Sequence, residues 1–121
     1  MKDVGLRAPN LNLRDGELDN ERMPYSADQL QHELARFNAA LGQVQRLAGR
    51  GLDHDFERRL DAHRRMLSDM LDADGVSVVM DTVAAAKSAL TSAEPFHDLR
   101  ALARAQETLG KLVRRRATRL G

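Results

Sequence analysis

The chain has 121 residues, of which 42% are hydrophobic, 31% charged and only 3% aromatic, and its formal net charge at pH 7 is +1. This length suits one compact domain with a tail and excludes two full domains. No stretch approaches the ~20 apolar residues of a membrane span, the first residues lack the apolar run of a secretory signal, and no cysteine is present. We therefore expect a cytoplasmic protein with no membrane contact and a core built from aliphatic side chains.

Residues 1–25 are predicted to form a flexible tail, and residues 26–121 a single helical domain. The first 24 residues contain several glycines, prolines and asparagines, and their apolar side chains follow no sustained helical period. An alternative stays open. The segment could instead become ordered against a partner or against its own domain.

The first predicted helix begins after Ser26. A serine followed three residues later by Gln29 is the pattern of a capping box, and Asp28 suits the first turn. The apolar residues that follow are spaced alternately by three and four, which places them on one stripe, or seam, as in a coiled coil. We predict that this seam packs against a helical partner or the rest of the bundle through Leu30, Leu34, Phe37, Leu41 and Val44. Gly49 and Gly51 mark the end of this helix.

Two shorter helices are expected next, one from Asp53 to Gly75 and one from about Ser77 to Ala93. In this interpretation Asp69, Asp72 and Asp74 crowd the end of the earlier helix, where the helix dipole disfavours negative charge. That end should therefore fray unless a cation neutralises it.

A long fourth helix is expected from Pro95 to about Leu120, spanning ~39 Å at 1.5 Å per residue. Phe96 and Leu112 flank its seam, and Gln106 and Arg116 interrupt it. Polar residues at such positions either set the register or oligomeric state, or lie solvated at the edge of a bundle. Because this helix is longer than the others, we expect its end to project or to contact a second chain.

Motifs for chemistry are weak throughout the sequence. Residues 72–75 read Asp-Ala-Asp-Gly, but a calcium-loop register would place Met70 at the first ligand position, so a helix end is the better interpretation. His54, Glu57 and Asp61 could share one helix face, but no second set of metal ligands accompanies them. His63 falls on the apolar stripe, where we expect it to be hydrogen-bonded to a neighbour. No nucleophile motif or phosphate loop is present. We therefore predict no catalytic residues, no metal, no cofactor and no enzyme activity.

The basic end of the chain is the most distinctive surface candidate. Residues 76–121 carry eight basic and four acidic side chains. Five of the cations form a patch: Lys111, Arg114, Arg115, Arg116 and Arg119. Such a patch can bind an acidic protein or nucleic acid, or it can simply complement the helix dipole.

The sequence thus predicts an all-α protein, a bundle of about four helices packed as an antiparallel bundle or as two hairpins. The expected function is a non-enzymatic interaction module, such as an adaptor, chaperone or small assembly subunit. It would pair with itself, as a homo-oligomer, or with another helical protein. The alternative is a nucleic-acid-associated regulator that uses the basic end of the fourth helix.

Overall fold

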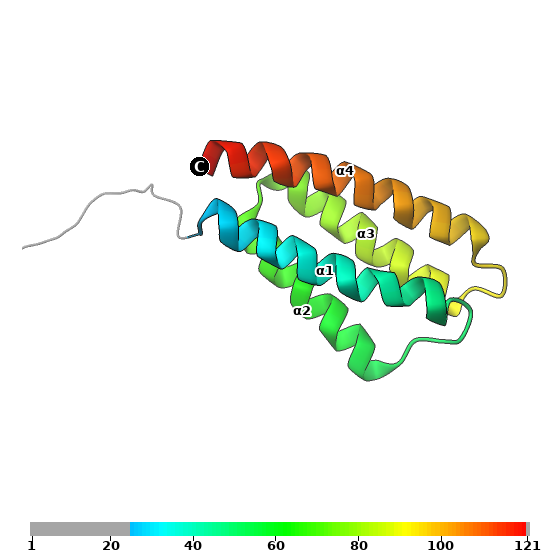
Figure 1. Ribbon diagram of the computed structural model, residues 1–121. Coiled ribbons are helices and arrows are strands. Elements are labelled where there is room, and N and C mark those ends of the chain that lie inside the picture. The colour runs from blue at the N-terminus through cyan, green and yellow to red at the C-terminus, as the bar shows by residue number, and fades with distance from the viewer. Residues whose placement is uncertain (1–24, 121) are drawn as a thin grey trace, which may run out of the picture.

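The computed structural model describes residues 25–120, so the predicted tail lies outside the described residues except for Tyr25. This part of the chain contains four α-helices and no strand: α1 (Ala27–Leu47), α2 (His54–Met70), α3 (Ala73–Thr91) and α4 (Phe96–Leu120). The predicted small all-α bundle is confirmed (Figure 1).

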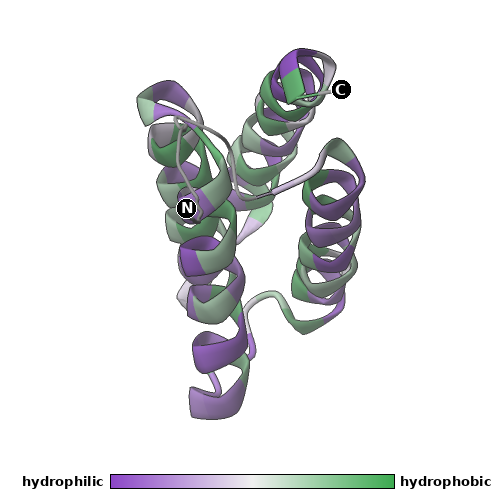
Figure 2. Cartoon of the chain, turned by 90° about the vertical axis from the view of Figure 1, so that its left-hand side faces the viewer, coloured by the Kyte–Doolittle hydropathy of each residue, from purple (hydrophilic) through white to green (hydrophobic). Residues whose placement is uncertain are grey.

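Successive helices run in opposite directions, so the bundle is antiparallel (Figure 1). α1 contacts α2 and α4, α3 contacts the same two helices, and α1 and α3 also meet across the centre. Each helix carries both hydrophobic and hydrophilic residues along its length (Figure 2). Short connections favour antiparallel neighbours, and amphipathic helices bury their apolar stripes by packing together.

All four helices contribute to one aliphatic core, whose apolar area removed from water provides the main driving force for folding. Tyr25, the last residue of the predicted tail, packs against it half-buried. The fully buried apolar side chains include Leu30, Phe37, Leu41, Val44, Leu60, Leu67, Val79, Ala86, Ala89, Leu90, Leu102, Leu109 and Val113.

The start of α1 has the predicted capping box. Ser26 Oγ accepts a hydrogen bond from the Gln29 amide at 3.0 Å, and the Ser26 amide donates to Gln29 Oε1 at 2.8 Å. Two amides of the first turn that would otherwise lack partners are thereby satisfied.

The connection between α1 and α2 contacts the C-terminal end of α3. Gly49 and Gly51 have backbone φ angles of +76° and +100°, which residues with a Cβ rarely adopt. Their amides donate to the carbonyls of Ala89 at 3.0 Å and Leu90 at 2.8 Å. The two glycines therefore end α1 as predicted and also satisfy carbonyls in the last turn of α3.

The predicted boundary between the second and third helices is wrong. α2 ends at Met70, and α3 begins at Ala73 instead of near Ser77. Asp72 is the N-cap of α3, because its Oδ1 accepts a hydrogen bond from the Gly75 amide at 3.1 Å. Asp72 and Asp74 therefore lie at a helix N-terminus, where the dipole favours negative charge. Gly75 does not end a helix; it lies buried in the first turn of α3.

The end of α4 does not project from the bundle, contrary to the first of the two expectations for it, and contact with a second chain stays a prediction. Val113 and Ala117 are buried in the chain's own core. Arg116 Nε donates to the Met70 carbonyl at 3.3 Å, and Arg119 pairs with Asp72 at 3.3 Å. The last turns of α4 thus cover the connection between α2 and α3.

Candidate interaction surface

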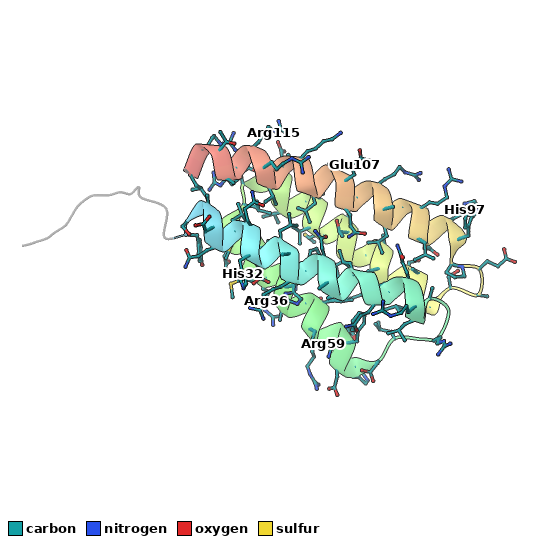
Figure 3. All side chains as sticks on the ribbon, viewed as in Figure 1. His32, Arg36, Arg59, His97, Glu107 and Arg115 are labelled. Carbon is teal, nitrogen blue, oxygen red and sulfur yellow. The ribbon has the colours of Figure 1, made fainter. Side chains whose placement is uncertain are left out.

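The solvent-facing side of α4 carries a row of cations that extends beyond the predicted patch. We call it the basic face, and the exposed cations that form it are Arg100, Arg104, Lys111, Arg114, Arg115 and Arg119. The opposite side of α4 buries Leu102, Leu109 and Val113, so the amphipathic pattern of this helix turns the cations outward. The face runs for ~29 Å from Arg100 to Arg119 at 1.5 Å per residue. Figure 3 shows Glu107 and Arg115 along the outer side of α4.

The five predicted patch residues do not act alike. Arg116 is half-buried and bonds to Met70, so it belongs to the interior contact. Lys111 lies 3.9 Å from Glu107, and Arg119 lies 3.3 Å from Asp72, yet both cations stay more than half exposed. Arg114 and Arg115 are exposed and form no ion pair with any residue of 25–120. Four of the five therefore remain on the surface.

The prediction did not include Arg100 and Arg104, although the sequence contained a signal for them. They lie four residues apart, and Arg104 lies seven residues before Lys111, so a helix brings all three to one side. Neither Arg100 nor Arg104 forms an ion pair within residues 25–120.

An exposed aromatic side chain marks the first turn of α4. Phe96 is 64% exposed, although its spacing from the seam also allowed a buried position. The guanidinium of Arg100 lies 5.6 Å from the centre of the Phe96 ring, within the range of a cation–π contact. The centres of the His97 and Phe96 rings lie 6.1 Å apart, and Figure 3 shows His97 at this end of α4. Aromatic and arginine side chains are enriched where proteins bind each other.

The predicted seam of α1 faces inward. Leu30, Leu34, Phe37, Leu41 and Val44 are at most 9% exposed and belong to the core. A partner could reach these side chains only by displacing another helix of the bundle.

A cluster of charges joins α2 to α3. Lys87 Nζ lies 3.2 Å from Asp61 and 3.4 Å from Glu57, and Arg64 lies 3.5 Å from Asp61. Partial burial raises the pKa of Asp61, but hydrogen bonding and attraction from Lys87 and Arg64 outweigh it and hold that pKa below its ordinary value of 3.8. His54, the third member of the considered metal set, is exposed. The carboxylates of Glu57 and Asp61 thus serve an interhelical ion pair.

His63 forms the hydrogen bond that its place on the apolar stripe predicted. Its Nδ1 lies 2.7 Å from Glu33 Oε2 of α1, and both side chains are largely buried. The imidazole also lies against Phe37, with ring centres 6.0 Å apart. A buried carboxylate needs such a partner, so this pair is readily explained as a link between α1 and α2.

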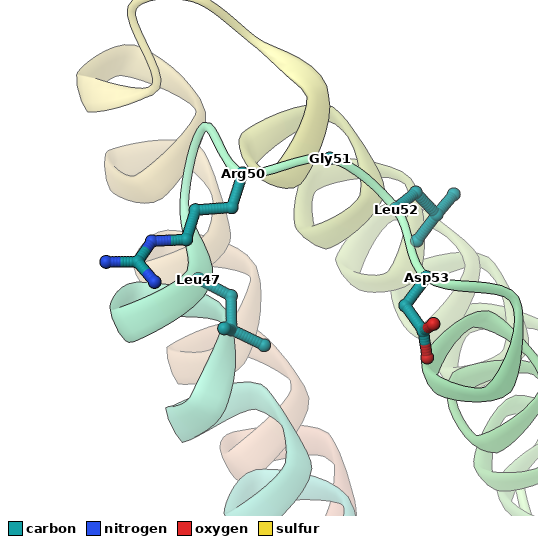
Figure 4. A pocket seen from close by; sticks show the side chains of 5 residues that line it. All are labelled: Leu47, Arg50, Gly51, Leu52 and Asp53. Atoms are coloured by element: carbon teal, nitrogen blue, oxygen red, sulfur yellow. The ribbon is translucent and has the colours of Figure 1, made fainter.

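Surface hollows formed by residues 25–120 include two near the ends of the bundle. One of about 360 Å³ lies beside the connection between α1 and α2, with Leu47 and Arg50 on one side and Leu52 and Asp53 on the other (Figure 4). Asp53 is already engaged, since its carboxylate caps the Phe56 amide at 3.1 Å. The other, of about 100 Å³, lies between the first turn of α3 and the end of α4.

Within residues 25–120, no group of three or more histidine and carboxylate side chains is placed to hold a metal ion. None of the described helices combines the length and the apolar character that crossing a membrane requires. Comparison with protein-family models, curated proteins and solved structures found no match to this chain.

Proposed function

We propose that this chain is a non-enzymatic helical interaction module that binds an acidic protein partner through the basic face of α4. The observation that carries the proposal is the row of outward cations. Of these, Arg104, Arg114 and Arg115 have no acidic partner within residues 25–120. Such a row attracts a negatively charged surface and orients it before contact. An adaptor, chaperone or assembly subunit in the cytoplasm would use a face of this kind.

Two features favour an acidic protein over nucleic acid. The net charge of the whole chain is only +1, and Glu107 interrupts the row of cations, which is unfavourable along a phosphate backbone. Phe96 is the one exposed phenylalanine in residues 25–120 and stands at one end of the face, whereas base stacking uses aromatic side chains along a groove. Phe96 and Arg100 are instead residue types that are enriched at protein–protein interfaces.

The experiment compares two triple variants with the same change in charge. The test variant is Arg104→Gln, Arg114→Gln and Arg115→Gln on the basic face. The control variant is Arg46→Gln, Arg50→Gln and Arg65→Gln, which removes exposed cations that lie outside α4 and also form no ion pair within residues 25–120. Each immobilised protein is incubated with cell extract, and bound proteins are identified by mass spectrometry.

We expect acidic proteins that bind the parent and the control but not the test variant. The association rate of one such protein, once purified, should fall as salt rises, because steering by exposed charges is screened. Equal binding to all three forms would contradict the proposal. Tight binding of a 20-base-pair DNA duplex, lost only in the test variant, would assign the face to nucleic acid instead.

A further inference from the structure

The last three turns of α4 carry most of the exposed positive charge of this helix. Lys111, Arg114, Arg115 and Arg119, which we call the terminal basic cluster, are all exposed. Lys111, Arg115 and Arg119 follow one another at intervals of four residues, which places successive cations ~6 Å apart along one side of the helix. The acids beside the cluster, Glu107, Asp72 and Asp74, offset only part of its charge, since Arg114 and Arg115 pair with none of them.

The sequence ahead of α1 contains a complementary pattern. Asp15, Glu17, Asp19 and Glu21 alternate with uncharged residues, so residues 15–21 carry a charge of −4 with no cation among them. In an extended segment, alternate side chains share one side at a spacing of ~6.6 to 6.8 Å. That spacing is close to the ~6 Å between successive cations of the cluster.

The attachment point of this segment lies close to the cluster. α1 and α4 are antiparallel neighbours, so the beginning of α1 lies at the same end of the bundle as the end of α4 (Figure 1). Tyr25 packs against the core and fixes where the chain enters α1. Residues 21 to 15 precede Tyr25 by four to ten positions, a reach of up to ~35 Å, whereas the cluster spans ~12 Å of helix.

We propose that the acidic segment 15–21 binds the terminal basic cluster of α4 within the same chain. Attachment to α1 gives the segment an effective concentration in the millimolar range, so even weak charge pairing leads to occupancy. The segment would then compete with an acidic partner for the same cations. The competition rests on the proposed function, but the contact itself does not.

The contact can be measured without any partner. Because the chain has no cysteine, Leu18→Cys introduces a single site for a nitroxide spin label in the middle of the segment. Paramagnetic broadening of the backbone amides is then recorded by NMR at low salt. A second protein carries the same label together with Asp15→Asn, Glu17→Gln, Asp19→Asn and Glu21→Gln. It measures the broadening that attachment alone produces.

We expect broadening at residues 111–119 above that baseline. It should be lost at 0.5 M salt, because the screening length for exposed charges at this salt concentration is on the order of 3 to 10 Å. The same loss is expected when Lys111, Arg114, Arg115 and Arg119 are changed to Gln, but not in the control variant of Arg46, Arg50 and Arg65. Equal broadening with and without the four carboxylates would overturn the proposal. Broadening in a mixture of labelled and isotope-enriched chains would also overturn it, since the contact would then join two chains. Neither result depends on whether an acidic partner binds α4.

Discussion

Phe37 lies at the middle of α1 with none of its side chain exposed, and its ring packs against His63. Changing Phe37 to Asp would remove this burial and place a carboxylate among aliphatic groups. We expect a loss of about 3 to 5 kcal/mol in the free energy of unfolding, measured by urea denaturation followed by circular dichroism. Ala39→Asp, two positions along on the exposed side of α1, is the control and should cost well under half as much. Similar losses for both changes would contradict the burial of Phe37.

The ion pairs of Asp61 predict a dependence of stability on pH. Because the pKa of Asp61 is lowered on folding, its contribution is present above the ordinary value of 3.8 and disappears as the pH falls through the lowered value. The Asp61 side chain is 27% exposed, so the contribution is modest, up to about 1 kcal/mol.

We therefore expect Asp61→Asn to be less stable than the parent at pH 7 and equally stable at pH 2, in urea denaturation at both values. Asp69→Asn removes the same charge from the last turn of α2, where no cation within residues 25–120 pairs with it. That control should not reproduce the loss at pH 7. A difference between the parent and Asp61→Asn that persists unchanged at pH 2 would count against the ion-pair explanation.

At the scale of the elements, the junction of α2 and α3 depends on one glycine. A Cβ added to Gly75 would lie 2.8 Å from the Leu71 Cβ, closer than unbonded carbons approach, and neither atom is the end of a flexible side chain. Gly75→Ala should therefore force the two helices apart and cost about 1 to 3 kcal/mol.

Gly42 provides the opposite case within the same fold. It lies on the exposed side of α1, and a Cβ there would meet nothing within 4 Å. Gly42→Ala should stabilise the chain by roughly 0.5 to 1 kcal/mol, because alanine loses less conformational freedom than glycine in a helix. Thermal and urea denaturation of both variants should show shifts of opposite sign. A stabilising shift for Gly75→Ala would refute the close approach at Gly75.

At the scale of the whole molecule, a single core connects all four helices, since each helix contacts at least two others. A fragment of residues 25–121 should therefore unfold in one cooperative transition, as single domains of this size usually do. Calorimetry should give equal calorimetric and van't Hoff enthalpies. Two separate transitions would instead indicate that the helices form two independent hairpins.

Much of the fold can be predicted from local patterns in the sequence. The capping box at Ser26 and the three-four spacing of α1 predict that helix closely, because both signals depend on neighbours within one or two turns. The hydrogen-bonded state of His63 was also predicted, since a polar ring on an apolar stripe needs a partner. The partner itself, Glu33, was not predicted, because it lies thirty residues away and meets His63 only when α2 packs on α1.

Tertiary structure decided the features that local patterns could not resolve. Gly75 reads as a helix end in isolation, but the fit of Leu71 against it places the residue inside α3 and makes Asp72 a cap. Arg116 falls on the seam of α4 in the sequence, but its partner, the Met70 carbonyl, is decided by the packing of α4, while Arg114 and Arg115 stay exposed. Helix formation and amphipathic stripes depend on neighbouring residues, so the sequence by itself determines them. The boundary between α2 and α3 and the set of exposed charges depend on how side chains from distant segments fit together. Only the tertiary structure decides these features.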